Sequence, residues 1–292
     1  MLAIAKNLKP EDRSYDVVTG LSIADINAVG LAKYPPGQEL EAATYLKQTW
    51  LSIIQKDIYV DWPLGIINGV LFQKGFFNNA PYVDYVNMFL NNATFKRKFS
   101  IGVVNANDGK YYTYNETTPL NDLKPYFVAS GAIAGFYPFS IIKGEDLIDG
   151  STLFAIDLFT AIQRCLDITG NVQSDIILDA VLLEKNKSLE KNMTGAHSLQ
   201  MLMRYFEINS FLMSTYYIQD VMRHFPNVNY RYLLTPVAKL PGGGVFGLDY
   251  NQNDISYMID LGEKETTYYI KNHPTSNWKQ EISERMAYLK QR

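Results

Sequence analysis

The segment Asp16–Ala28 joins a short apolar run to a glycine turn, a serine and a set of helix-forming residues. This order predicts a strand that turns sharply into a helix at Ser22, with Gly20 allowing close approach of the two elements. A serine at such a turn exposes its hydroxyl, and the helix that follows offers unpaired N–H groups and the positive end of its dipole. The pattern is typical of a nucleophile elbow, but a plain turn with Ser22 as helix cap satisfies it equally well.

Composition disfavours several other classes of protein. The chain of 292 residues is 47% hydrophobic and 20% charged, which is typical of a globular protein with a sizeable core. Polar residues interrupt its apolar runs well short of a membrane span, so no transmembrane helix is expected. The net charge of −3, with basic residues scattered apart from the cluster 96–98, disfavours nucleic-acid binding. One cysteine, Cys165, and three scattered histidines give neither a disulfide nor zinc-ligand spacing, so no metal and no cofactor are expected.

The compartment is left open by the sequence. The apolar run 1–6 is too short for a signal peptide, so the sequence as given carries no export signal. Four glycosylation sequons begin at Asn92, Asn115, Asn186 and Asn192. They would fit a secreted protein if a leader preceded the first residue, although chance explains them in an Asn-rich chain.

Helical and strand patterns alternate along the chain. Helices are predicted at 22–32, 39–55, 122–130, 153–169, 196–225, 254–272 and 277–291. Strands are predicted at 98–104, 110–114, 139–142, 175–183 and 230–237. Such alternation favours an α/β fold with a largely parallel sheet covered on both faces. No linker is convincing enough to divide 1–292 into separate domains.

The apolar segment 61–72 is interrupted by Pro63, Gly65 and Gly69. We therefore expect an irregular loop whose large side chains join a satellite of the core. A loop that lines or covers an acyl-chain pocket is the alternative.

A serine nucleophile needs a base that takes its proton. His197 and His224 fall within or at the end of the predicted helix 196–225, and His273 precedes a proline in a turn. None has the context of a catalytic histidine, although a histidine-dependent serine hydrolase remains one hypothesis. A carboxylate is the other candidate base, and a second segment of the chain bears on it.

That second segment is Val128–Pro138, which contains Ser130, Gly131 and Gly135 and is followed by Asp149 and Gly150. Together with 20–28, it resembles the two signatures of the patatin-like phospholipases, in the family's order and at a plausible separation. The resemblance covers about 15–183, with a helical extension at about 196–292. It implies a single three-layer α/β/α sandwich with a central, largely parallel sheet.

The resemblance also implies a chemistry. Ser22 would be the nucleophile and Asp149 the base of a dyad that cleaves acyl esters of phospholipids or other acyl lipids through an acyl-enzyme, with transient contact at a membrane surface. Gly20, Ala24 and Gly150 would support the elbow and the dyad. Because a carboxylate is a weak base, a positive field such as a helix N-terminus must lower the cost of forming the alkoxide.

Two residues of the elbow depart from the family pattern. Ala24 stands where the family usually has glycine, which is modest crowding at the start of the helix. Asp25 replaces a small apolar residue, and its negative charge would oppose a developing oxyanion. These departures are compatible with an impaired activity.

The family's glycine-rich oxyanion loop has no counterpart before the elbow, because the fourteen residues that precede Tyr15 contain no glycine. Either the sequence begins downstream of this loop, or the protein is a degenerate member of the family. The Ile23 N–H is one candidate donor for an oxyanion. A rearranged loop at Gly242, Gly243 and Gly244 is a less favoured one. A catalytically inactive protein that binds lipid or a protein partner is the alternative function.

Overall fold

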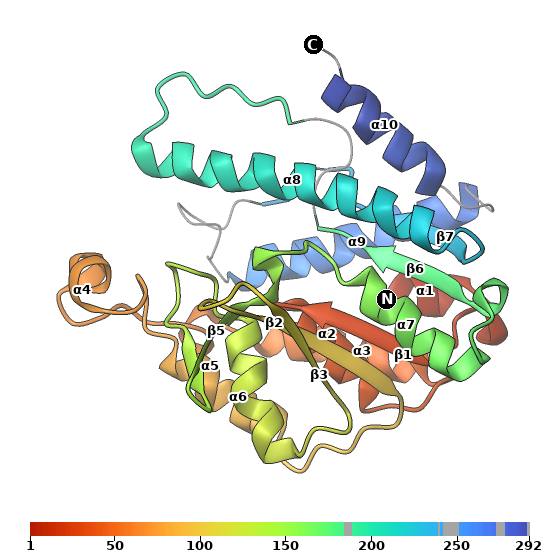
Figure 1. Ribbon diagram of the computed structural model, residues 1–292, viewed down its shortest axis with the longest axis horizontal. Coiled ribbons are helices and arrows are strands. Elements are labelled where there is room, and N and C mark those ends of the chain that lie inside the picture. The colour runs from red at the N-terminus through yellow and green to blue at the C-terminus, as the bar shows by residue number, and fades with distance from the viewer. Residues whose placement is uncertain (184–188, 239, 242–250, 273–277, 291–292) are drawn as a thin grey trace. The chain divides into compact units, whose positions relative to one another are not determined.

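The structure is a computed structural model that describes residues 1–183, 189–238, 240–241, 251–272 and 278–290. The chain divides into two compact units, one formed by Met1–Leu153 with Tyr250–Ile255 and the other by Phe154–Asp249 with Ser256–Arg292. The first unit contains Ser22, Asp149 and a five-stranded sheet (Figure 1). Each unit is described separately below.

The sheet of the first unit is built around one buried strand. Its strands are β1 (Val17–Leu21), β2 (Lys98–Asn105), β3 (Tyr111–Asn115), β4 (Ser140–Ile142) and β5 (Glu145–Asp149). Strand β2 is parallel to β1 and antiparallel to β3 and β5, while β4 pairs with β5. All but the first residue of β2 are buried, as expected for a strand covered on both faces. The predicted α/β class is confirmed.

The pairing register brings two strand ends together. Strand β3 runs along one side of β2 and pairs with residues 100–104. Strand β1 pairs with 98–102 and β5 with 103–105, so these two strands must share the other side. Because β1 runs with β2 and β5 runs against it, β1 ends at Leu21 opposite Gly102 and β5 ends at Asp149 opposite Val103. The two C-terminal ends therefore face one another at neighbouring positions of β2.

Helices of the first unit cover this sheet. They are α1 (Leu2–Asn7), α2 (Ala24–Ala32), α3 (Glu39–Ser52), α4 (Gly65–Phe72), α5 (Ala80–Phe89) and α6 (Leu120–Ser130). Helix α2 packs on β1 and β2, and α3 packs on α1 and α2. Helix α6 contacts β2, β4 and β5, and α5 packs on α6. The segments that follow β1 and α6 are thus held against the same part of the sheet.

The expectation for the segment 61–72 is wrong. Instead of a loop over the core, the structure has helix α4, which begins at Gly65; Gly65 and the preceding Leu64 both have positive φ. Its central glycine, Gly69, faces the backbone of Phe76, where a Cβ atom would lie 2.3 Å from the carbonyl oxygen. The large apolar side chains point to solvent, with Leu64 90% and Phe72 77% exposed.

The second unit has its own core. It contains α7 (Leu158–Thr169), α8 (Ser198–His224), most of α9 (Gln252–Asn272) and α10 (Trp278–Lys290), with β6 (Ile177–Val181) parallel to β7 (Asn229–Leu234). Trp278 and Arg285 of α10 are fully buried, and the Arg285 guanidinium donates to the side chains of Ser214 and Thr215. Cys165 is partly buried against this core. None of the described helices is long and apolar enough to cross a membrane.

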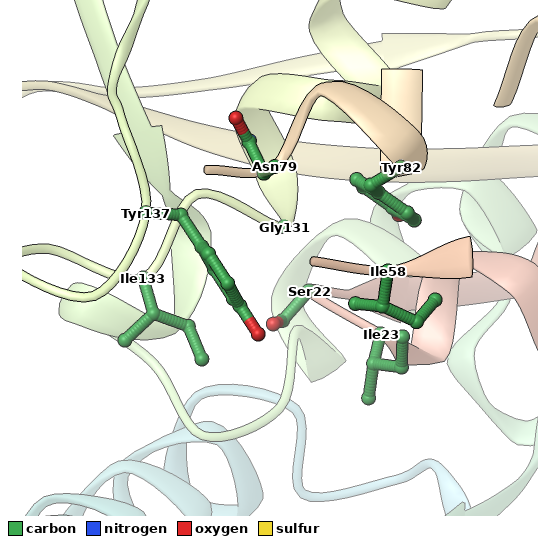
Figure 2. A pocket seen from close by; sticks show the side chains of 8 residues that line it. All are labelled: Ser22, Ile23, Ile58, Asn79, Tyr82, Gly131, Ile133 and Tyr137. Atoms are coloured by element: carbon green, nitrogen blue, oxygen red, sulfur yellow. The ribbon is translucent and has the colours of Figure 1, made fainter. Parts of the chain in front are cut away.

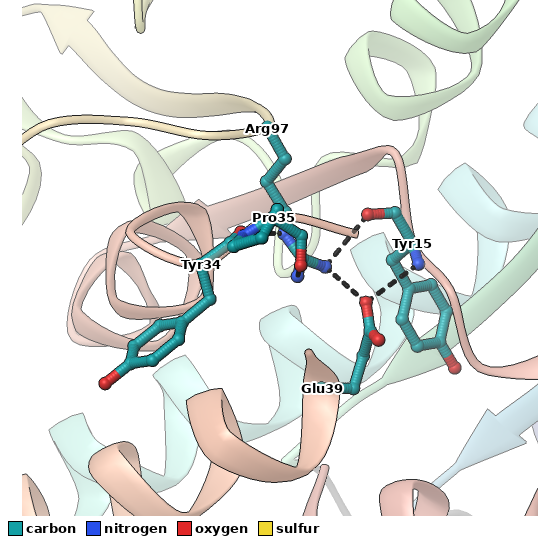
Figure 3. Close-up of polar contacts among 5 residues, drawn as sticks. All are labelled: Tyr15, Tyr34, Pro35, Glu39 and Arg97. Atoms are coloured by element: carbon teal, nitrogen blue, oxygen red, sulfur yellow. Dashed lines mark hydrogen bonds and ion pairs between the residues drawn. The ribbon is translucent and has the colours of Figure 1, made fainter. Parts of the chain in front are cut away.

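A buried ion pair ties together the segments around the elbow strand (Figure 3). Arg97, just before β2, lies 2.7 Å from Glu39 at the start of α3, and both side chains are fully buried. The same guanidinium donates to the carbonyls of Tyr15, Tyr34 and Pro35, and the Glu39 carboxylate accepts the Tyr15 N–H. The segment that enters β1, the segment that leaves α2 and the start of α3 are therefore all held by Arg97 and Glu39.

Arg97→Met is expected to lower the free energy of unfolding by about 3–5 kcal/mol, because it leaves Glu39 as an unpaired buried carboxylate. Lys96→Met, at the exposed neighbour, should change it by less than about 0.5 kcal/mol. Urea denaturation of the two variants and the parent protein measures both values. Equal stability of all three proteins would contradict a structural role for the pair.

Candidate active site

Ser22 lies at a sharp turn between β1 and α2. Its φ angle of 57° is in the left-handed region, which serine rarely adopts. Helix α2 begins two residues later at Ala24, so the predicted helix start at Ser22 is slightly early. A Cβ atom on Gly20 would lie 2.6 Å from the Ala24 carbonyl oxygen, so only glycine allows this approach of strand and helix. The strand, the positive φ and the helix start match the pattern of a nucleophile elbow, and the N-cap residue of α2 is Ile23, not Ser22.

Ser130, at the end of α6, joins the elbow to the sheet. Its hydroxyl accepts the Ser22 N–H at 3.2 Å and donates to the Gly102 carbonyl at 2.7 Å. The side chain is completely buried, so water does not replace these two bonds. Ser130 therefore fixes the backbone of Ser22, the residue with the strained φ angle.

Asp149 is the last residue of β5 and is 1% exposed. Its N–H donates to the Ala132 carbonyl at 3.1 Å, and its Oδ1 accepts the Ser151 N–H at 2.7 Å. Burial raises the pKa of Asp149 to about 6, while hydrogen bonds with the Ser22 side chain and with Ser151 oppose the rise. The site thus holds a carboxyl group that takes up and releases a proton near neutral pH.

Gly150 makes the position of Asp149 possible. A Cβ atom on Gly150 would lie 2.5 Å from the Gly102 carbonyl oxygen and 3.0 Å from Leu21. The chain leaving β5 therefore crosses directly over the junction with β1. The predicted supporting roles of Gly20 and Gly150 correspond to close backbone contacts on either side of that junction.

A small cavity of about 30 Å³ lies against Ser22 (Figure 2). Its walls are mainly apolar and are formed by Ile23, Ile58, Asn79, Tyr82, Gly131, Ile133 and Tyr137 together with Ser22. The hydroxyl of Tyr137 points toward the hydroxyl of Ser22, with Ile133 on one side and Ile23 and Ile58 on the other. This volume holds about one water molecule.

Asp25 lies beneath the elbow, in the first turn of α2, and is fully buried. Desolvation raises its pKa well above the usual range, the nearby Asp149 raises it further, and the Ser130 hydroxyl lowers it. The neutral form of Asp25 is therefore favoured. The sequence suggested a full negative charge here, and burial reduces that obstacle to an oxyanion.

The structure brings most of the predicted site residues together. Ser22, Ile23 and Ala24 follow one another at the elbow, and Asp149 and Gly150 lie next to them on the same side of β2. His197 directly precedes α8 and His224 is its last residue, both in the second unit. His273 and the glycines Gly242, Gly243 and Gly244 lie outside the described residues.

Ser130 and Tyr137 were not identified as site residues from the sequence. Both lie in the second signature segment, 128–138, so that segment already contained the signal. Their contribution depends on where the end of α6 meets β2, which periodicity does not predict. The described residues contain no cluster of three side chains able to hold a metal ion.

Comparison with known proteins agrees with this geometry. The family model for patatin-like phospholipases matches residues 1–162, which is more than half of the chain. The protein therefore belongs to the patatin-like phospholipase family. A search of curated proteins found no match. The matched region contains both the elbow and the Asp149–Gly150 turn.

Gly20→Ala is expected to destabilise the protein by about 1–3 kcal/mol, because the new methyl group has no room against the Ala24 carbonyl. Gly262→Ala is the matched control, since nothing lies within 4 Å of the added methyl and alanine favours helix α9 by about 1 kcal/mol. Thermal and urea unfolding distinguish the two. A Gly20→Ala protein as stable as the parent would contradict the close contact between Gly20 and Ala24.

Proposed function

We propose that the protein is a lipid acyl hydrolase that cleaves an ester of a phospholipid or another acyl lipid with a Ser22–Asp149 dyad. The observation that carries the proposal is that Ser22, with its strained φ angle, and Asp149 lie at neighbouring positions along β2. Burial raises the pKa of the Asp149 carboxyl group, which supports its role as the base. Membership of the patatin-like phospholipase family supports lipid ester hydrolysis as the reaction.

In the proposed mechanism, Asp149 takes the proton of the Ser22 hydroxyl as its oxygen attacks the ester carbonyl. The N-terminus of α2, including the Ile23 N–H, faces the negative charge that develops on the carbonyl oxygen. Collapse of this intermediate gives an acyl-serine, and the departing alcohol takes the proton from Asp149. Water then loses a proton to Asp149 and attacks the acyl-serine, and as the fatty acid leaves, Asp149 gives that proton to the Ser22 oxygen, which restores both residues.

Burial of Asp149 serves this scheme. A carboxylate with an ordinary pKa is a very weak base toward a serine hydroxyl, and the raised pKa brings Asp149 closer to the range in which proton transfer is efficient at neutral pH. The hydroxyl of Tyr137, which points at Ser22, is a second hydrogen-bond donor on the side of the cavity opposite Ile23.

A non-catalytic role, in binding lipid or a protein partner, is the second candidate. One observation favours it, namely that the cavity at Ser22 is about 30 Å³ and has no space for an acyl ester as it stands. A hydrolase requires this cavity to open when substrate arrives, whereas a binding protein does not. Turnover of a soluble ester separates the two functions.

Ser22→Ala and Asp149→Asn are each expected to lower the hydrolysis of a short-chain p-nitrophenyl ester by at least about a thousandfold, because they remove the nucleophile and the base. Asp146→Asn, on the same strand as Asp149, should retain the parent rate. Circular dichroism of each variant checks folding. Turnover unaffected by both site substitutions would exclude the dyad.

The rate should also depend on the protonation of Asp149. Because the base must be ionised, kcat/KM is expected to fall about tenfold per pH unit below about 6 and to level off above that pH. A pH profile with the soluble ester tests this in the parent protein. An acid limb centred near the ordinary pKa of aspartate would mean that the base is exposed and is not Asp149.

A further inference from the structure

We infer that helix α4 is a membrane-docking element that inserts into the acyl-chain layer of a phospholipid membrane beside the Ser22 pocket. This inference rests on the proposed function, because a lipid hydrolase must meet substrate that lies within a membrane. The element is contained in the first unit and stands out from its sheet (Figure 1).

The first observation is the exposure of apolar side chains around most of the helix. Ile66, Ile67, Val70, Leu71 and Phe72 are all exposed, and Ile67 and Leu71 are 67% and 65% exposed. At about 100° per residue, these positions cover roughly two thirds of the helix circumference. A groove on a protein partner covers one face of a helix, whereas fluid lipid surrounds it.

The second observation is how α4 is attached to the unit. Gly69 is its buried residue, and it lies against the backbone of Phe76. The apolar side chains on the other sides of the helix are exposed. Just before the helix, Leu64 has a φ angle of 70°, which is costly for leucine and holds its 90% exposed side chain in the solvent. In water, the strained backbone of Leu64 and its exposed side chain both cost free energy. An apolar environment around the side chain would remove the second cost.

The third observation is that three polar side chains of the segment form hydrogen bonds within it. The Asn68 side chain donates to the Pro63 carbonyl at 2.8 Å, and Gln73 donates to Asn68 at 3.4 Å. The Trp62 indole N–H donates to the Gly75 carbonyl at 3.0 Å. Because unpaired polar groups are what make insertion into hydrocarbon costly, these bonds reduce the cost for α4.

Charge on the segment also matches a membrane. The residues 63–73 carry no charge in a chain that is 20% charged. Asp61 and Lys74 flank them with opposite signs, which suits the zwitterionic headgroup layer of phosphatidylcholine. Helix α4 has eight residues and a length of about 12 Å, so it can enter one leaflet and cannot span a bilayer.

The connection after α4 leads directly to the pocket. The N–H groups of Phe76 and Phe77 donate to the carbonyls of Gly135 and Phe136, both at 3.0 Å. The next residue, Tyr137, lines the cavity at Ser22. The hydrogen bonds between the segment after α4 and residues 135–136 therefore connect the helix to Tyr137 in the cavity wall.

The test uses the full chain with Ser22→Ala, so that binding is measured without turnover. This protein is floated with phosphatidylcholine vesicles, alone and with a second substitution, Leu71→Asp or Met88→Asp. Met88 is 68% exposed on α5 and is the matched control for Leu71. The parent and Met88→Asp should float, and Leu71→Asp should bind at least about tenfold more weakly, because it brings a charge into hydrocarbon.

Equal flotation of all three proteins, or none by the parent, would overturn the inference. So would a parent dimer that Leu71→Asp converts to a monomer without changing flotation, because the helix would then contact a second copy. A second experiment uses the chain with Ser22 intact. There, Leu71→Asp should hydrolyse the soluble p-nitrophenyl ester as fast as the unsubstituted protein.

If the unsubstituted protein does not hydrolyse this ester, the proposed function is contradicted, and the flotation result still decides the role of α4.

Discussion

The C-terminal ends of β1 and β5 meet on one side of β2, and the candidate site depends on this register. Strand β3 occupies the other side of β2, so β1 and β5 must follow one another along the remaining side. Ser22 directly follows the last residue of β1, and Asp149 is the last residue of β5. Glycines at 20 and 150 remove the side chains that would otherwise separate the crossing segments. A shift of either strand by one residue would send the alternating side chains to the opposite face.

Buried polar groups around the junction keep it in place. Arg97 and Glu39 fix the segments that enter β1 and leave α2, and Ser130 bonds both the elbow and the Gly102 carbonyl. Burial raises the pKa of both Asp25 and Asp149, and the charge of Asp149 raises the pKa of Asp25 further. Stability is thus given up at the site, and the surrounding network holds the strained residues there.

The elbow and the second signature could be read from the sequence because glycine, serine and aspartate have distinct local roles there. Most helices and the central strand follow from hydrophobic periodicity. Strand β5 could not be predicted, since its alternating polar residues become a strand only through pairing with β2. Arg97 belongs to the basic cluster 96–98 in the sequence, and only the fold shows its burial against Glu39. Helix α4 was not predicted because its two glycines suggest a loop. Its apolar residues lie on most sides of the helix, so the sequence lacks the alternation of polar and apolar faces that indicates a helix.

The central claim is that Ser22 is an activated nucleophile, and covalent labelling tests it most directly. A fluorophosphonate transfers its phosphoryl group to a serine oxygen only where a base and an oxyanion site activate that serine. The full chain is incubated with the probe, digested, and the modified residue is located by mass spectrometry. The account predicts an adduct on Ser22 that is strongly reduced in Asp149→Asn and unchanged in Asp146→Asn. A folded protein that remains unlabelled, or that is labelled at another serine, would contradict it.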